Sequence, residues 1–146
     1  MKTPKLHLYD SGLLCHLLGI RRPEQLREHP LRGAVFETWV VNEVSKFRLH
    51  SGVSGGLAFF RDRKGREVDL LVEDGGALTA VETKSAQTVN DDFFAGLAAF
   101  ADLVGSGRRV RSLRRVLVYG GVTRQQRSSA TVLPWSAIDR YDWTTG

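Results

Sequence analysis

The sequence lacks the features of a disulfide-stabilised or membrane-spanning protein. It has a single cysteine among its 146 residues, so no disulfide can form within the chain. Cys15 lies in the apolar run at residues 13–18, which predicts a buried structural thiol in a reducing compartment. No apolar run approaches the ~20 residues that cross a bilayer, and no signal-type segment follows Met1. These absences predict a cytoplasmic protein without a membrane partner.

The sequence also lacks a phosphate-binding loop, because no Gly-x-x-x-x-Gly-Lys-Ser/Thr string occurs in it. What is present is ordinary for a folded protein: 42% of the residues are hydrophobic and 25% are charged. A chain of this length can bury one core without disulfides or metals as staples. We therefore expect a single domain over residues 1–146.

The most informative segment is residues 65–84, which has the pattern of two strands around a pair of glycines. A two-residue loop at that pair places Asp69 across from Glu82, and Glu67 across from Lys84. Side chains alternate faces along a strand, so all four are expected on one face. Facing carboxylates about 4.5–5.5 Å apart repel each other. The pair of carboxylates beside a lysine therefore predicts a bound cation, and a divalent metal would supply it.

Positive charge is concentrated near the C-terminal third of a chain whose net charge is +5. The arginines concerned are Arg108, Arg109, Arg111, Arg114 and Arg115, followed by Arg124 and Arg127. Such clusters bind phosphates by releasing counterions. Alone they favour a solvated basic loop, but beside a metal-binding carboxylate pair they favour nucleic acid as the partner.

Helical and strand patterns alternate along the chain. After a helical lead-in over residues 1–30, with Asp10 capping a helix at residues 11–18, hydrophobic periodicity predicts the main elements. We expect helices at residues 33–49 and 92–104, and strands at residues 57–61, 66–73, 77–84, 115–119 and 131–133. This order is typical of an α/β fold.

The helix expected at residues 33–49 carries two glutamates that interrupt its apolar arc. Glu43 projects into the middle of the arc, and Glu37 falls near its edge. A buried carboxylate without a partner is costly, so each needs a basic group, backbone donors or a metal. A salt bridge from the helix to a loop explains Glu43 best, whereas Glu37 is balanced between such a bridge and a functional role.

Taken together, these residues resemble the PD-(D/E)XK nuclease superfamily, which has the restriction-endonuclease-like fold. The resemblance rests on the order Glu37 on a helix, Asp69 on a strand, and Glu82-Thr83-Lys84 on the next strand. More closely, the chain resembles the uncharacterised C-terminal domain of prokaryotic AAA-type ATPases, in residues 5–14, 33–43, 60–69 and 81–85. The resemblance implies a sandwich with a central mixed sheet of four or five strands flanked by helices.

The resemblance also implies metal-assisted hydrolysis of a phosphodiester. Asp69, Glu82 and the backbone carbonyl of Thr83 would hold Mg²⁺ or Mn²⁺, and Lys84 would position the attacking water. Glu37 would bind water of the metal or a second ion. Val68 stands where the superfamily name has proline. A plain Glu67–Lys84 salt bridge is the alternative explanation for the lysine.

The resemblance implies an ATPase module upstream, so we expect the chain to be a fragment of a longer protein. It leaves two functions open. One is a divalent-metal-dependent nuclease, with Glu37, Asp69, Glu82 and Lys84 as its catalytic residues. The other is a catalytically inactive module that binds DNA or a partner protein and is regulated by the ATPase. The sequence leaves the oligomeric state undetermined.

Overall fold

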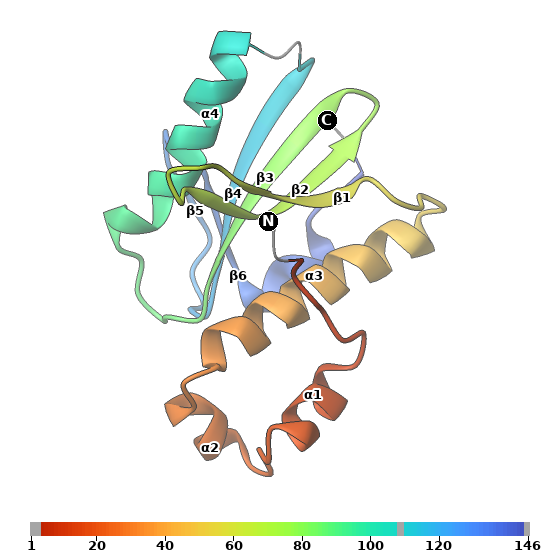
Figure 1. Cartoon of the computed structure of the whole chain (residues 1–146), viewed down its shortest axis with the longest axis vertical. Coiled ribbons are helices and arrows are strands. Elements are labelled where there is room, and N and C mark those ends of the chain that lie inside the picture. Colours follow the sequence, from red (N-terminus) through yellow and green to blue (C-terminus); the bar gives the residue numbers. More distant parts are fainter. Residues whose placement is uncertain (1–3, 108–109, 145–146) are drawn as a thin grey trace.

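The computed structural model describes residues 4–107 and 110–144, which form a mixed α/β structure (Figure 1). The helices are α1 Ser11–Leu17, α2 Pro23–Glu28, α3 Arg32–His50 and α4 Ala95–Gly107, with 3₁₀ helices η1 Asp91–Phe94 and η2 Trp135–Arg140. The strands are β1 Leu57–Arg61, β2 Glu67–Asp74, β3 Ala77–Lys84, β4 Ser112–Tyr119, β5 Gln125–Gln126 and β6 Thr131–Pro134.

The six strands form one open sheet in the order β1-β2-β3-β4-β6-β5. The first three strands are antiparallel, β3, β4 and β6 run parallel, and β5 is antiparallel to β6. The α/β class and the mixed sheet are as expected, but the expected four or five strands are too few. The extra strand is β5, two glutamines paired with the edge of β6, which is too short to show hydrophobic alternation.

The β2–β3 hairpin has the predicted register. Asp74 pairs with Ala77, and the ladder continues to Leu70 opposite Val81. The connecting Gly75 and Gly76 have φ of 56° and 85°, as both central residues of a type I′ turn require. Because these backbone angles strongly favour glycine, the turn fixes the register of the strands that carry the acidic residues.

Strand β2 changes phase near Asp69. Its pairing with β1 shifts by one residue between Ala58 and Phe60, as in a β-bulge. Val68 packs in one hydrophobic cluster, whereas Leu70 and Val72 pack in the other. Alternate residues of a regular strand share a face, so the simple alternation assumed from the sequence ends at Asp69.

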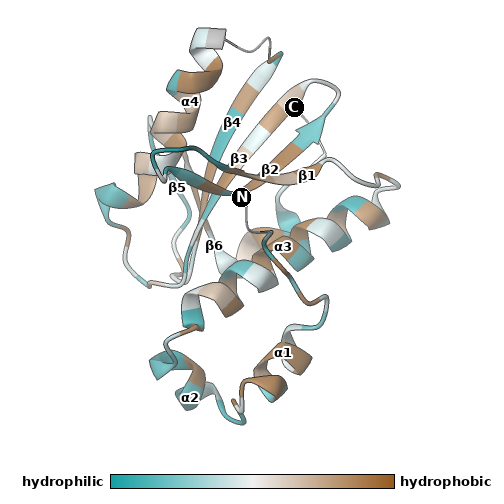
Figure 2. Ribbon diagram, in the orientation of Figure 1, coloured by the Kyte–Doolittle hydropathy of each residue, from teal (hydrophilic) through white to brown (hydrophobic). Residues whose placement is uncertain are grey.

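The sheet is covered on both faces. On one side α3 and η2 pack on Val81, Val116 and Val118, together with the fully buried Trp143. On the other side α4 and η1 pack on Ala80 and neighbouring apolar residues. Consequently β3 is buried along seven of its eight residues, and hydrophobic residues alternate with polar ones along the central strands (Figure 2).

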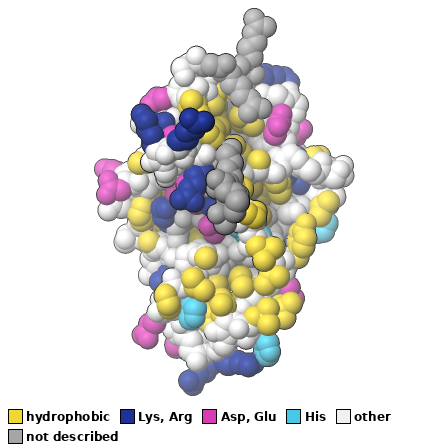
Figure 3. All heavy atoms as spheres, in the orientation of Figure 1, with side chains coloured by type: hydrophobic (Ala, Val, Ile, Leu, Met, Phe, Trp, Pro, Cys, Tyr) yellow, Lys and Arg dark blue, Asp and Glu magenta, His cyan; other side chains and the backbone are white. Residues whose placement is uncertain are grey.

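The N-terminal segment is tied to α3. The side-chain amide of Asn42 donates to the backbone carbonyl of Leu8 at 2.7 Å, and His7 Nδ1 lies 3.1 Å from Thr38 Oγ1. Hydrophobic side chains gather on the surface where α1 lies (Figure 3), including the exposed Leu13 and Leu17. Across the described segments, no helix combines the length and the apolar character needed to cross a bilayer.

Candidate functional site

Three of the four predicted catalytic residues line one cavity. Glu37 comes from α3, Asp69 from β2 and Lys84 from the end of β3, and they enclose a volume of about 320 Å³ together with Thr83 and three small neighbours. The fourth, Glu82, reaches this group through Lys84, whose Nζ donates to Glu82 Oε1 at 2.6 Å. The fold therefore brings the predicted set together from three separate elements.

Asp69 is held by Thr83 rather than by a continuous β-ladder. Its Oδ2 accepts hydrogen bonds from the backbone amide and the hydroxyl of Thr83, both at 2.9 Å. The bulge in β2 lies beside Asp69. The other carboxylate oxygen, Oδ1, faces Lys5 rather than Thr83. The sequence predicts Thr83 as a metal ligand through its carbonyl; the structure adds that its amide and hydroxyl orient Asp69.

Glu82 is a buried carboxyl group with a perturbed pKa. Burial, and then the nearby negative charge of Asp69, raise its pKa from 4.5 to about 7, against the opposing effects of Lys84 and Lys5. The alternative explanation for Lys84, a cross-strand salt bridge to Glu67, is wrong. Glu67 instead pairs with Arg61 at 3.1 Å. Lys84 pairs with Glu82 instead, at 2.6 Å.

Lys5 is a component of the site that the sequence argument missed. Its Nζ lies 2.8 Å from Glu37 Oε1 and 3.4 Å from Asp69 Oδ1, and the two carboxylates are only 18% and 13% exposed. Burial by itself lowers the pKa of Lys5, but the hydrogen bond to Glu37 and the surrounding carboxylates outweigh it and raise the pKa. A protonated ammonium thus bridges two of the predicted catalytic carboxylates.

Glu43 has a structural partner away from this site, as predicted. It pairs with Lys46 one turn along α3, whereas the sequence interpretation expected a partner from a loop. The two helix glutamates therefore differ in the predicted way: Glu37 faces the cavity, and Glu43 takes part in a pair within its own helix.

The cavity is lined by two carboxylates, Glu37 and Asp69, and a third, Glu82, adjoins it through its hydrogen bond to Lys84. Asp69, Glu82 and Glu37 offer carboxylate oxygens, which Mg²⁺ and Mn²⁺ prefer, and Asp69 and Glu37 already share one cationic group, Lys5. Within residues 4–107 and 110–144, no three carboxylate, imidazole or thiol groups converge as a ready metal-binding group. In this arrangement two lysine ammonium groups neutralise the carboxylates instead.

Part of the predicted basic cluster makes hydrogen bonds within the fold, whereas Arg111 and Arg124 are exposed. Arg108 and Arg109 lie outside the described residues. Arg114 donates to Thr79 Oγ1 at 3.0 Å, and Arg115 donates to the carbonyl of Ser128 at 3.1 Å. Basic residues near the acidic cavity come from elsewhere, because Arg27 and Arg32 flank Ala86 and Gln87 beside it. Hydrophobic periodicity gave no signal for these two arginines.

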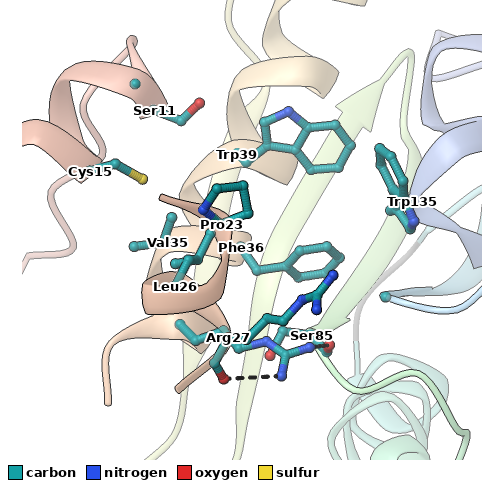
Figure 4. Close-up of a pocket in the computed structure, with 13 residues that line it drawn as sticks. Ser11, Cys15, Pro23, Leu26, Arg27, Val35, Phe36, Trp39, Ser85 and Trp135 are labelled. Atoms are coloured by element: carbon teal, nitrogen blue, oxygen red, sulfur yellow. Dashed lines mark hydrogen bonds between the residues drawn. The ribbon is translucent and has the colours of Figure 1, made fainter. Parts of the chain in front are cut away.

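Cys15 is half-buried rather than buried as expected. It lines an open pocket between α1 and α3 (Figure 4), so its thiol does not contribute to a closed core.

Comparison with known proteins identifies a family and distant relatives. Residues 32–138 match a family described as "Domain of unknown function (DUF4143)". Two mycobacterial proteins, Uncharacterized protein Mb2031c of Mycobacterium bovis and Uncharacterized protein Rv2008c of Mycobacterium tuberculosis, are each 31% identical over 87 residues. The alignment covers 60% of this chain and 19% of each relative, so the chain spans about a fifth of their length. No solved structure shows a significant match to the chain.

Proposed function

The chain belongs to the DUF4143 family, and from the site that its fold builds we propose that it is a divalent-metal-dependent nuclease-like domain. The observation that carries the proposal is the shared cavity of Glu37, Asp69 and Lys84, with Glu82 hydrogen-bonded to Lys84. Residues from a helix and two strands converge on this cavity. A polar sheet face that is only exposed to water would need no such convergence. A polar cluster this close to the core is costly unless it has a use.

The architecture supports assignment to the restriction-endonuclease-like fold and the PD-(D/E)XK superfamily. A mixed sheet carries helices on both faces, and the acidic residues lie on adjacent antiparallel strands near its centre. Asp69 precedes Glu82-Thr83-Lys84 in the order that the superfamily motif requires. Val68 in place of proline removes no ligand.

In the proposed reaction, Asp69, Glu82 and the carbonyl of Thr83 would hold Mg²⁺ or Mn²⁺. The bound metal supplies Lewis-acid activation of the scissile phosphate and of a water molecule. Thr83 keeps the Asp69 carboxylate oriented through two hydrogen bonds. Lys84 places a positive charge at the cavity, where it orients the water and offsets charge that develops on the phosphate.

Lys5 would compete with a metal for Asp69, because both cations would use the same carboxylate. Glu37 can keep its 2.8 Å contact with Lys5 or take a water of the metal. The N-terminal segment thus belongs to the site in this proposal, and the helical lead-in has more than a connecting role.

The setting of this activity is also a proposal. The relatives are about five times longer than the aligned segment, which leaves room for the ATPase module that the sequence resemblance implies. Nucleic acid is the expected partner and the cytoplasm the expected compartment. A second function, an inactive DNA- or protein-binding module regulated by that ATPase, is favoured by one observation: Lys5 already neutralises Glu37 and Asp69.

Cleavage assays on single-stranded and duplex DNA and on RNA, with and without Mg²⁺ or Mn²⁺, separate these two functions. The proposal expects metal-dependent cleavage that is lost in Lys84→Ala, while this variant still binds metal. Glu37→Gln is expected to lower the rate, and Glu43→Gln is its matched control on the same helix. Wild-type protein that binds metal and nucleic acid but cleaves neither DNA nor RNA would favour the inactive module.

A further inference from the structure

A second hollow lies beside the acidic cavity and is unused by the proposed chemistry. It has a volume of about 690 Å³ and is bounded by α1, α2, α3 and the start of η2. Phe36, Trp39 and Trp135 lie together on one side of it, opposite Ser11 and Cys15 of α1 (Figure 4). Aromatic rings therefore form the principal wall of an open pocket.

The three rings are arranged for contact with a further flat group. Phe36 and Trp39 have centroids 5.9 Å apart with an interplanar angle of 32°, and Trp39 meets Trp135 edge-on at 6.0 Å. Trp135 is 46% exposed, although a large ring of this kind is normally buried well. Its free surface borders the pocket.

Two guanidinium groups connect this pocket to the acidic cavity. Arg27 and Arg32 line the aromatic pocket and also the hollow next to it. Arg32 donates to the carbonyl of Ser85, and Ser85 lines both the aromatic pocket and the acidic cavity. An extended ligand can thus pass from the rings, over two positive charges, to the carboxylates. Guanidinium groups bind phosphate oxygens with good geometry.

We propose that the aromatic pocket receives an unpaired base of a single-stranded nucleic acid, with the adjoining phosphates on Arg27 and Arg32. This rests on the proposed function and adds its substrate class. A base can stack on protein rings only when its own faces are free, as in a single strand or a frayed end. The neighbouring phosphodiester then lies towards Glu37, Asp69 and Lys84. A closed duplex cannot fill the pocket.

The test compares two probes with the same number of phosphates. One is an oligothymidylate of about ten nucleotides, and the other is an oligomer of equal length without bases. Affinities for the full chain are measured by fluorescence anisotropy with Ca²⁺ replacing Mg²⁺, and tryptophan emission is followed in parallel. The wild type is expected to bind the thymidylate at least about fivefold more tightly, the lower limit of aromatic stacking effects, with quenched emission.

Trp135→Leu should bring the two affinities together, because it removes a ring on which the base would stack. The ring is exposed, so its removal should leave the core closed. Tyr9→Leu, which alters an exposed aromatic outside the pocket, should keep the wild-type ratio. Arg27→Gln should weaken both probes and reduce the salt dependence by about one phosphate contact.

Equal wild-type affinities for the two probes, or an unchanged ratio in Trp135→Leu, would show that the pocket does not bind a base. A protein ligand would then be the remaining occupant. Absence of binding to either probe would overturn it as well. Metal titration of the same samples keeps the two proposals distinct, because the carboxylate site can bind metal whether or not the pocket binds a base.

Discussion

At the scale of single residues, the ammonium group of Lys5 and a divalent metal compete for the same carboxylate. Lys5 contacts both Glu37 and Asp69 and belongs to a segment hydrogen-bonded to α3. In the protein without metal it offsets the repulsion between partly buried carboxylates. It therefore stabilises the fold while weakening the attraction of the site for another cation.

Lys5→Met should strengthen metal binding and weaken the metal-free fold. Removal of the ammonium group that contacts Asp69 is expected to tighten Mn²⁺ binding by at least about threefold, in line with modest pair energies of up to ~1 kcal/mol. Calorimetric titration measures the affinity. Lys46→Met is the matched control, because Lys46 pairs with Glu43 outside the site. Unchanged or weaker Mn²⁺ binding by Lys5→Met would show that Lys5 does not compete.

Glu82 should make stability depend on pH in an unusual direction. Its pKa rises from 4.5 to about 7 on folding, so the folded protein retains a proton that the unfolded chain has released between these values. The resulting stabilisation is complete below about pH 4.5 and is lost as the pH rises through 7. At ~1.4 kcal/mol per pKa unit, the loss amounts to at most about 3.5 kcal/mol.

Urea unfolding of the wild type and Glu82→Gln at about pH 5 and pH 8 measures this effect. The wild type should lose stability relative to Glu82→Gln at the higher pH, because glutamine does not ionise. Parallel changes in both proteins would rule out a raised pKa at Glu82.

At the scale of secondary structure, the approach of α4 to the sheet depends on Gly96. A Cβ atom at this position would clash with the backbone carbonyl of Glu67 and lie 3.4 Å from Glu82 Oε2. The missing side chain thus lets α4 pack closely on the strands that carry the acidic residues.

Gly96→Ala should destabilise the protein by about 1–3 kcal/mol through overpacking, despite the better helix propensity of alanine. Gly105→Ala provides the control in the same helix, because nothing lies within 4 Å of its added Cβ. This change should stabilise the protein by about 0.5–1 kcal/mol. Chemical denaturation measures both, and equal effects of the two substitutions would contradict the close contact at Gly96.

Local patterns predicted the elements well where they were regular. The glycine pair fixed the β2–β3 register, and the apolar period located α3 within one residue at each end. The bulge in β2 was not predicted because it depends on pairing with β1. Strand β5 was not predicted because two residues are too few to show a hydrophobic period. The sequence predicted Asp69 directly across from Glu82, but the β2–β3 ladder ends at the Leu70–Val81 pair. The contact between Asp69 and Thr83 could not be read from alternation.

At the scale of the whole molecule, the site joins segments that are distant in the chain. Lys5 lies 64 positions from Asp69, and Arg32 lies 53 positions from Ser85. Such contacts leave no periodic signal, which explains why Lys5, Arg27 and Arg32 were missed whereas the motif residues were found. The contacts of Arg114 and Arg115 were missed for a related reason, since these side chains bond to Thr79 and to the carbonyl of Ser128.

The whole site predicts linked effects of Asp69→Asn. Without metal, this variant removes a charge that disfavours ionised Glu82, so it should fold at least as stably as the wild type. Loss of the salt bridge to Lys5 works in the opposite direction but involves the longer of its two contacts, at 3.4 Å. Thermal melting in EDTA tests this balance, and a large fall in melting temperature would contradict it.

The most direct test of the central claim is calorimetric titration of Mn²⁺ and Mg²⁺ into the wild type and Asp69→Asn at about pH 8, where Glu82 is ionised. The account predicts saturable binding in the wild type, and a matching rise in melting temperature, because the metal binds the folded carboxylates and hardly the unfolded chain. Asp69→Asn should show neither effect. Absence of heat and of a thermal shift in the wild type, or equal binding by the variant, would contradict a metal site at Asp69 and Glu82.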